Sequence, residues 1–174
     1  MRKLLVSIWE IVEVVLISLA AVFVIRTFIA QPFLVSGASM EPNFQDGNYL
    51  IIDELTYRFR EPERGDVIVF RFPKDTKTFF IKRILGLPGE RVVVDNGTIE
   101  VSSEGKSVYR EGGTSGAYKG VLKTGQYFVV GDNRYNSFDS RSWGPIEKKH
   151  IIGLARLRVL PLNELDIIKH GENY

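Results

Sequence analysis

The chain contains no cysteine and only two histidines, and both scarcities exclude kinds of chemistry. Without cysteine there is no disulfide, no thiolate nucleophile and no cysteine metal site. His150 lies in a charged run and His170 in a polar stretch near the end, so neither has the setting of a buried imidazole oriented by a carboxylate. Two widely separated histidines also form no zinc pattern. We therefore expect neither a metal nor a cofactor, and the sequence does not favour a histidine base.

The chain also lacks an excess of charge of one sign. Its formal net charge is +2, and its basic residues are scattered among acidic ones. A nucleic-acid partner calls for a strongly basic surface, so we expect none. With 174 residues, of which 44% are hydrophobic and 25% charged, the chain suits one folded domain with a short appendage. We expect a monomer.

One long apolar run is present, at the N-terminal end. Residues 4–30 are mostly apolar, and from Val14 to Ile25 the only polar side chain is Ser18. A helix that crosses a bilayer needs about 20 predominantly apolar residues. Charges toward the ends of such a helix can reach the headgroups, which applies here to Glu10, Glu13 and Arg26. The sequence therefore predicts a transmembrane helix from about Ser7 to Phe28.

The charge in front of this run indicates its orientation. Met1-Arg2-Lys3 favours a cytoplasmic N-terminus. We expect residues 1–30 to form a cytoplasmic stub and a single-pass anchor in the plasma membrane, and residues 31–174 to form a domain on the exported side. A cleaved secretory signal and an amphipathic helix on the bilayer surface are the alternatives. The apolar run passes Ala20-Ala21 without a break, which favours a retained anchor.

Beyond Gln31-Pro32 the pattern is that of β structure. Short runs of Val, Ile, Phe and Tyr alternate with turn residues, and Asn96-Gly97 is typical of a two-residue hairpin. We expect a mainly β domain with coiled antiparallel or barrel-like sheets. Residues 102–123, polar and rich in glycine and serine, are expected to form a mobile surface excursion. The candidate strands are Phe33–Val35, Asn48–Asp53, Asp66–Phe72, Phe79–Leu85, Arg91–Val94, Thr98–Val101, Tyr127–Gly131 and Ile151–Val159.

Ser39 is the candidate nucleophile. It follows Gly37 and Ala38, which keep the approach to its hydroxyl uncluttered, and precedes Pro42. A serine hydroxyl is a poor nucleophile until a neighbouring base takes its proton. A backbone amide in this turn could bind the oxyanion of a tetrahedral intermediate. The alternative is a serine in an ordinary turn at the end of a strand.

Lys82 is the candidate base. An ordinary lysine titrates near pH 10.4, so making it neutral at pH 7 would cost about 4.6 kcal/mol, but burial can lower its pKa by several units. On a strand, Phe80, Lys82 and Ile84 share one face, which surrounds the amine with apolar groups. The alternative is a lysine that extends to solvent from a sheet edge. We predict that Ser39 attacks and that Lys82 accepts its proton.

A third block, Gly131–Gly144, contains many small and polar residues. A loop of this composition needs hydrogen bonds from side chains to hold its shape, and a pair between Asp139 and Arg141 is expected to contribute. Such a loop can also support a neighbouring active site.

These blocks together resemble the bacterial type I signal peptidases, membrane-bound Ser/Lys proteases that remove signal peptides from exported proteins. The short form of the chain looks like the Gram-positive type, or equally like the organelle inner-membrane relatives. The resemblance implies that signal peptides of preproteins and the lipid bilayer are its partners. The blocks that carry it are Pro32-Phe33, Ser39-Met40-x-Pro42, Arg64–Phe70, Lys82-Arg83-Ile84-x-Gly86-x-Pro88-Gly89, Gly131-Asp132-Asn133 and Asp139-Ser140-Arg141.

The resemblance also implies roles for residues around the proposed dyad. Ser39 would be the nucleophile and Lys82 the general base, and Ser137 would hydrogen-bond to the lysine amine. Asp139 and Arg141 would pair to support the loop. Asp132 would lie behind them.

Substrate-binding positions follow from the same resemblance. Val35 and Ile81 match positions that line pockets for small side chains, which suits cleavage after Ala-x-Ala. Gly37 and Met40, which flank the nucleophile, would also lie next to the substrate. Some family members have a serine at the position of Gly37 that assists the oxyanion hole, so this chain departs from them there. The substrate would bind extended, as an added strand.

Two other functions fit parts of the pattern. One is a self-cleaving repressor-type Ser/Lys peptidase, but such proteins are soluble and usually carry a DNA-binding module. The other is a catalytically silent, membrane-tethered β-domain that binds exported peptides. The apolar run and the Gly131–Gly144 block argue against the first, and the presence of both Ser39 and Lys82 argues against the second.

Overall fold

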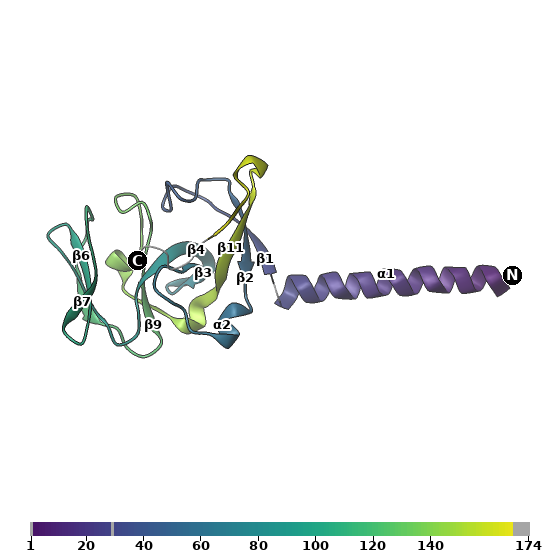
Figure 1. Cartoon of the computed structure of the whole chain (residues 1–174), viewed down its shortest axis with the longest axis horizontal. Coiled ribbons are helices and arrows are strands. Elements are labelled where there is room, and N and C mark those ends of the chain that lie inside the picture. The colour runs from purple at the N-terminus through teal and green to yellow at the C-terminus, as the bar shows by residue number, and fades with distance from the viewer. Residues whose placement is uncertain (1, 29, 169–174) are drawn as a thin grey trace.

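A long helix, α1 (Arg2–Phe28), extends away from a domain built of β-strands in the computed structural model (Figure 1). The structure describes residues 2–28 and 30–168, with side chains for residues 7–23 and 31–168, so His170 lies outside the described residues. Large apolar side chains of α1 are exposed around the helix, among them Trp9 (68%), Leu16 (60%) and Phe23 (65%).

The predicted membrane span over about Ser7 to Phe28 is not confirmed. Among the residues that the structure describes, no helix is long and apolar enough to cross a membrane.

Eight strands form the larger sheet. Its order is β1-β2-β11-β3-β4-β9-β10, with β12 beside β11, and its strand pairs are antiparallel. Within the described residues, β1 pairs only with β2 and β10 only with β9, so the sheet stays open and the expected barrel-like closure is absent. The strands are β1 (Ala30–Leu34), β2 (Tyr49–Asp53), β3 (Val67–Phe72), β4 (Asp75–Gly86), β9 (Gln126–Val130), β10 (Ile146–Glu147), β11 (Ile151–Leu160) and β12 (Asp166–Ile167).

A second sheet of four strands lies at the end of the domain far from α1 (Figure 1). Its order is β7-β6-β5-β8, made of β5 (Arg91–Asp95), β6 (Thr98–Ser103), β7 (Lys106–Gly112) and β8 (Tyr118–Val121). The predicted hairpin at Asn96-Gly97 joins β5 to β6, with φ angles of 47° and 75° at its two central residues.

Residues 102–123, expected to form a mobile surface excursion, contain strands that the sequence did not predict. They contribute β7 and β8 to the second sheet, where Tyr109 and Tyr118 pack against its buried core. The strands were missed because their remaining side chains are largely polar and exposed, so the backbone pairing with β5 and β6 defines them rather than an apolar pattern. The short helical elements are α2 (Thr56–Phe59), α3 (Ser140–Trp143), η1 (Lys148–His150) and η2 (Leu162–Glu164).

Strand β4 carries Lys82 and lies in the larger sheet over its whole length, where even its last residue, Gly86, pairs with Phe128 of β9. Leu85, next to its end, packs in the core cluster that the second sheet shares. A β-carbon at Gly86 would lie 2.8 Å from Leu122 Cδ1 and 2.9 Å from Phe128 Cβ, so only glycine lets the strand pass this closely. Because β4 is fixed at both ends, the position of Lys82 along it is fixed as well.

Candidate active site

Ser39 lies in a turn that the larger sheet and a carboxylate hold in place. The chain leaves β1 and returns to β2, and Val35 N donates to Asn48 O at 2.9 Å across the base of this loop. Gly37 has a φ angle of 86°, which favours glycine, and its amide donates to Asp46 Oδ1 at 2.7 Å. Ser39 itself is partly exposed. The turn therefore presents the hydroxyl at the surface of the β domain.

Asn133 fixes the same turn from the far side of the sequence. Its backbone amide donates to Ser39 O at 3.0 Å, and its side-chain amide donates to Ala38 O at 3.1 Å. The sequence alone predicted no role for Asn133. Its place next to Asp132 in the Gly131–Gly144 block indicates that it belongs to the supporting loop, but only the fold decides that it contacts the turn of Ser39.

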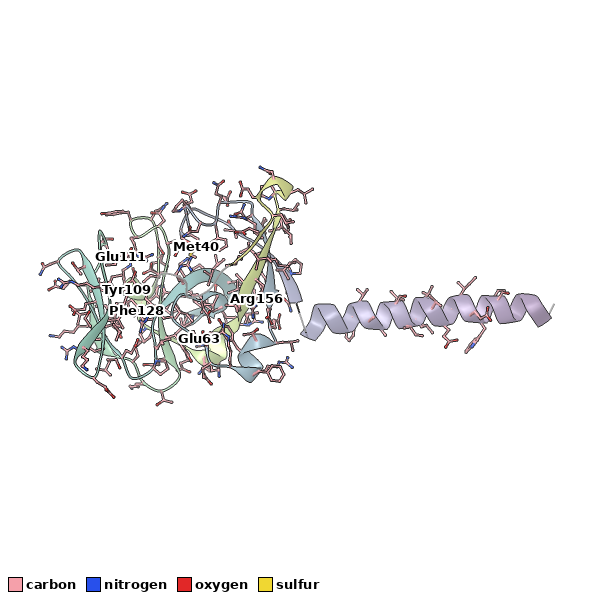
Figure 2. All side chains as sticks on the ribbon, in the orientation of Figure 1. Met40, Glu63, Tyr109, Glu111, Phe128 and Arg156 are labelled. Atoms are coloured by element: carbon pink, nitrogen blue, oxygen red, sulfur yellow. The ribbon has the colours of Figure 1, made fainter. Side chains whose placement is uncertain are left out.

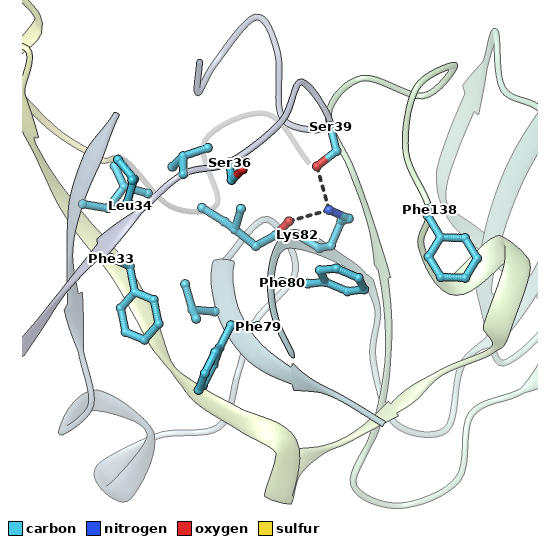
Figure 3. A pocket seen from close by; sticks show the side chains of 12 residues that line it. Phe33, Leu34, Ser36, Ser39, Phe79, Phe80, Lys82 and Phe138 are labelled. Carbon is cyan, nitrogen blue, oxygen red and sulfur yellow. Dashed lines mark hydrogen bonds between the residues drawn. The ribbon is translucent and has the colours of Figure 1, made fainter. Parts of the chain in front are cut away.

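Lys82 projects from β4 toward Ser39 (Figure 3). Its side chain is buried, and Nζ lies 2.7 Å from Ser39 Oγ and 2.8 Å from Ile81 O, in hydrogen bonds with both. The Phe80 ring centroid lies 5.4 Å from the amine. Among the described residues no carboxylate forms an ion pair with Lys82. The structure thus brings the two predicted reacting groups into direct contact.

Burial lowers the pKa of Lys82 to about 8. The charges of Asp139 and Asp132 act against this shift and that of Arg141 adds to it, but neither carboxylate is close enough to restore an ordinary lysine pKa. A substantial fraction of the amine is therefore neutral in weakly alkaline solution. Within the part of the chain described here, no cluster of His, Cys, Asp or Glu could hold a metal ion.

The Asp139–Arg141 pair lies inside the Gly131–Gly144 loop. Asp139 is fully buried, and its carboxylate accepts hydrogen bonds from Arg141 Nη2 at 2.7 Å, Arg141 Nε at 2.8 Å and the Gly131 amide at 3.0 Å. Burial alone would raise the pKa of Asp139, but the hydrogen bonds from Arg141 and Gly131 outweigh it and hold the pKa below its usual value. The carboxylate stays ionised and ties the two ends of this loop segment together.

Asp132 is paired with Arg83 rather than placed behind the Asp139–Arg141 pair. Arg83 Nε donates to Asp132 Oδ1 at 2.8 Å and Nη2 to Oδ2 at 2.7 Å. Asn43 Nδ2 donates to the same carboxylate at 2.8 Å, which connects the Ser39 segment to the loop. Arg83 follows Lys82 on β4, so alternation along the strand sends the two cations to opposite faces. The sequence alone predicted no role for Arg83.

Ser137 does not make the expected hydrogen bond to Lys82. Its hydroxyl is buried beside Asp139 and helps to lower the pKa of that carboxyl, yet it has no hydrogen-bond partner of good geometry among the described residues. It packs against Gly131, where a β-carbon would collide with both the Ser137 side chain and the carbonyl oxygen of Ser39. Glycine at this position lets the Gly131–Gly144 loop reach the nucleophile turn.

An apolar pocket of about 200 Å³ opens beside Ser39 and Lys82 (Figure 3). Val35 and Ile81, both expected to bind substrate, line it. Met40 does not, because it is fully buried in the core, and Gly37 is exposed outside the lining. The other lining residues are Phe33, Leu34, Ser36, Ser39, Leu50, Val69, Phe79, Phe80, Lys82 and Phe138. A nucleophile, a deprotonatable amine and an acyl-sized hollow are the parts that acyl transfer requires, so the site is a candidate for a serine hydrolase.

Known proteins are similar in sequence to this chain over most of its length. The family model described as signal peptidase, peptidase S26, matches residues 8–160, and the chain therefore belongs to this family of proteases. A probable signal peptidase I-2 from Synechocystis is 38% identical over 152 residues, 83% of this chain and 69% of that protein. Signal peptidase I V from Bacillus subtilis is 38% identical over 162 residues, 84% of this chain and 94% of that protein. The crystal structure of a signal peptidase I from Enterococcus faecalis aligns with 55% of this chain and 97% of its own, at 26% identity and a TM-score of 0.46.

The lowered pKa predicts that Lys82 destabilises the folded protein near neutral pH. Its pKa falls from 10.5 to about 8 on folding. Below pH 8 Lys82 is protonated in both the folded and the unfolded chain, and the folded chain bears the full free-energy cost of burying the charged amine. Between pH 8 and 10.5 the unfolded chain binds more protons, so stability rises with pH. Lys82→Met should therefore raise the free energy of unfolding by about 3 kcal/mol at pH 7, and by less at pH 9.5.

Urea unfolding of the purified chain at both pH values measures this difference. Lys77→Met, at an exposed position of the same strand, is the matched control and should change stability at neither pH. A Lys82→Met variant less stable than wild type at pH 7, or a difference independent of pH, would contradict the assignment of a buried, weakly basic amine.

Proposed function

We propose that this protein is a serine endopeptidase that cleaves N-terminal signal peptides from exported preproteins, with Ser39 as nucleophile and Lys82 as general base. The observation that carries the proposal is the 2.7 Å contact between Ser39 Oγ and the buried Lys82 amine. Family membership supports the reaction class, and the relatives named signal peptidase I support the substrate class.

In the proposed mechanism, neutral Lys82 takes the proton of Ser39 Oγ as the oxygen attacks the scissile carbonyl carbon. The Ser39 amide, which has no hydrogen-bond partner among the described residues, is available to donate to the oxyanion. The protonated amine then gives its proton to the leaving amino group, and an acyl-enzyme remains. Lys82, neutral again, deprotonates the water that attacks the ester. The lysine then returns this proton to Ser39 Oγ as the ester bond breaks and the acyl product is released.

The pocket beside the dyad supports cleavage after small residues of the Ala-x-Ala type. Its apolar lining next to Ser39 suits apolar side chains, and the relatives named signal peptidase I support this substrate class. Strand β1 pairs on one side only within the described chain, and its Leu34 lines the pocket. An extended substrate could therefore add beside β1 with its scissile bond at Ser39.

We also propose that residues 1–30 attach the protein to a lipid bilayer and that residues 31–174 form a monomeric catalytic domain on the exported side. Helix α1 exposes large apolar side chains in all directions and extends away from the β domain (Figure 1). Large exposed apolar side chains on a helix need apolar surroundings, which lipid supplies. A signal peptide is itself an apolar segment, so this placement brings enzyme and substrate to the same interface.

Removing either reacting group should abolish cleavage. Ser39→Ala and Lys82→Met should each lower the rate of preprotein cleavage by at least about 1,000-fold, because acyl transfer loses its nucleophile or its base. Gel analysis of a reconstituted preprotein reaction measures the rate, and mass spectrometry of the product should place the cut after a small residue.

The matched controls are Ser142→Ala and Lys77→Met, two exposed positions outside the pocket, which should cleave as wild type does. Undiminished cleavage by Ser39→Ala or by Lys82→Met would rule out the proposed dyad.

The cleavage rate should follow the deprotonation of one group with a midpoint near pH 8. The pKa of Lys82 is lowered to about 8, so the neutral, reactive fraction grows as pH rises. At pH 6 roughly 1% of the amine is neutral in the free enzyme, and kcat/KM should be about 100-fold below its alkaline plateau. A profile of kcat/KM from pH 5.5 to 10 tests this, and a value that is constant over that range would be incompatible with a lysine base.

Charge placed in the middle of α1 should release the protein from membranes. Leu16→Asp combined with Leu19→Asp adds two carboxylates where each costs about 3 kcal/mol in a bilayer. Wild type should remain in the membrane pellet after alkaline carbonate extraction, and the double variant should appear in the supernatant. Phe59→Asp, at an exposed site on α2, is the control and should stay in the pellet. Release of wild type would contradict attachment through α1, and protease digestion of oriented vesicles would report the side of the domain.

A further inference from the structure

We propose that the second sheet positions the active-site loop, through contacts of Glu111 with Arg134 and of Thr114 with Arg141. The inference rests on the proposed function and extends it by two positioning residues outside the pocket. Figure 2 shows Glu111 and Tyr109 on the side of this sheet that faces the rest of the domain. Residues 111–116, at the end of β7 and in the connection to β8, are called the support segment below.

The support segment is itself firmly placed. The Thr114 amide donates to Gly97 O at 3.2 Å, which joins the segment to the β5–β6 hairpin. Gly113 and Gly116 have φ angles of 74° and 98°, which let the chain turn sharply on either side of Thr114. Thr114 is buried, with 7% of its surface exposed. The segment can therefore act as a fixed point for groups that contact it.

The first contact joins Glu111 to Arg134. Arg134 Nη2 donates to Glu111 Oε2 at 2.8 Å and Nε donates to the same oxygen at 3.0 Å. Tyr109 also donates to this oxygen, at 2.6 Å, which restricts the glutamate further. Arg134 Nη1 donates to Gly131 O in the active-site loop. Glu111 thus holds the buried Arg134 guanidinium, which in turn holds Gly131, the residue that packs against the Ser39 turn.

The second contact joins Thr114 to Arg141. Arg141 Nη1 donates to Thr114 Oγ1 at 2.7 Å and to Ser115 O at 3.2 Å. A β-carbon at Gly116 would lie 3.2 Å from Arg141 Cβ, so the segment also packs along the arginine stem. Arg141 Nη1 further donates to Arg134 O at 2.6 Å, which couples the two contacts. The support segment therefore holds both arginines of the loop.

Displacement of Arg141 would change the pKa of Lys82 as well as the position of the loop beside it. Arg141 holds the Asp139 carboxylate, which in turn binds the Gly131 amide. The charged groups that act on the Lys82 amine are Asp139, Asp132 and Arg141, and Arg83 neutralises Asp132. If Arg141 retreats, its repulsion weakens and Asp139 is less neutralised, and both changes favour the protonated amine. Loss of the support should therefore move the pH midpoint of the reaction upward.

Thr114→Val tests this because it keeps the side-chain shape and removes the oxygen. Kinetics of preprotein cleavage by the full chain should show kcat lowered about 10-fold, within the loss of up to about 100-fold that small misplacements cause. KM should stay within about twofold, since Thr114 does not line the pocket, and the midpoint of the pH profile of kcat/KM should rise. Thr114→Ser restores the oxygen and should restore both quantities. Glu111→Gln, whose side chain is 35% exposed and keeps its volume, should lower kcat with KM unchanged, because it weakens the hold on Arg134 and Gly131.

Thr124→Val, at an exposed turn, is the matched control and should behave as wild type. Wild-type kcat in both Thr114→Val and Glu111→Gln, or a wild-type pH midpoint in Thr114→Val, would overturn the proposal. So would a loss of activity that only follows a loss of folded protein, seen by circular dichroism, with the midpoint unchanged. If Thr114→Val does not fold, the kcat and KM of Glu111→Gln decide whether the second sheet positions the loop. Failure of the dyad is distinguishable, because Ser39→Ala would then cleave normally whatever the Thr114 variants do.

Discussion

The burial of the Lys82 amine against Ser39 is the constraint on which the rest of the site depends. An amine in this position is held away from water without a carboxylate partner among the described residues, so its neutral form is favoured. The same burial that makes it a base costs folding free energy. The surrounding β structure must therefore hold the amine in place: the strand that carries it lies inside the larger sheet, and its Leu85 packs against residues of the second sheet.

Three segments far apart in sequence meet at this point. The turn after β1 supplies Ser39, β4 supplies Lys82, and the Gly131–Gly144 loop supplies Asn133, whose hydrogen bonds fix the carbonyls of the turn. Gly131 allows the closest approach, because any side chain there would collide with both the loop and the turn. The second sheet adds a fourth segment through its contacts with Arg134 and Arg141. The dyad is thus held from several directions at once.

The parts of the fold that follow from local sequence were predictable, and those that follow from pairing were not. The β5–β6 hairpin was expected because Asn96-Gly97 tolerates positive φ angles. β7 and β8 were missed because their polar side chains give no apolar alternation, and only neighbouring strands make them strands. The pairing of Arg83 with Asp132 was not predicted, because which face of β4 meets which loop depends on strand register.

The sequence by itself determined the chemistry available to this protein. With no cysteine and no suitably placed histidine, a serine and a lysine with apolar neighbours were the groups left for acyl transfer. Only the tertiary structure decided that they touch, that Met40 belongs to the core and not to the pocket, and that the Ser137 hydroxyl makes no hydrogen bond to the amine. The reason is physical: residue types and local propensity act over a few neighbours, whereas burial and hydrogen bonding are set by segments that the fold brings together from across the chain.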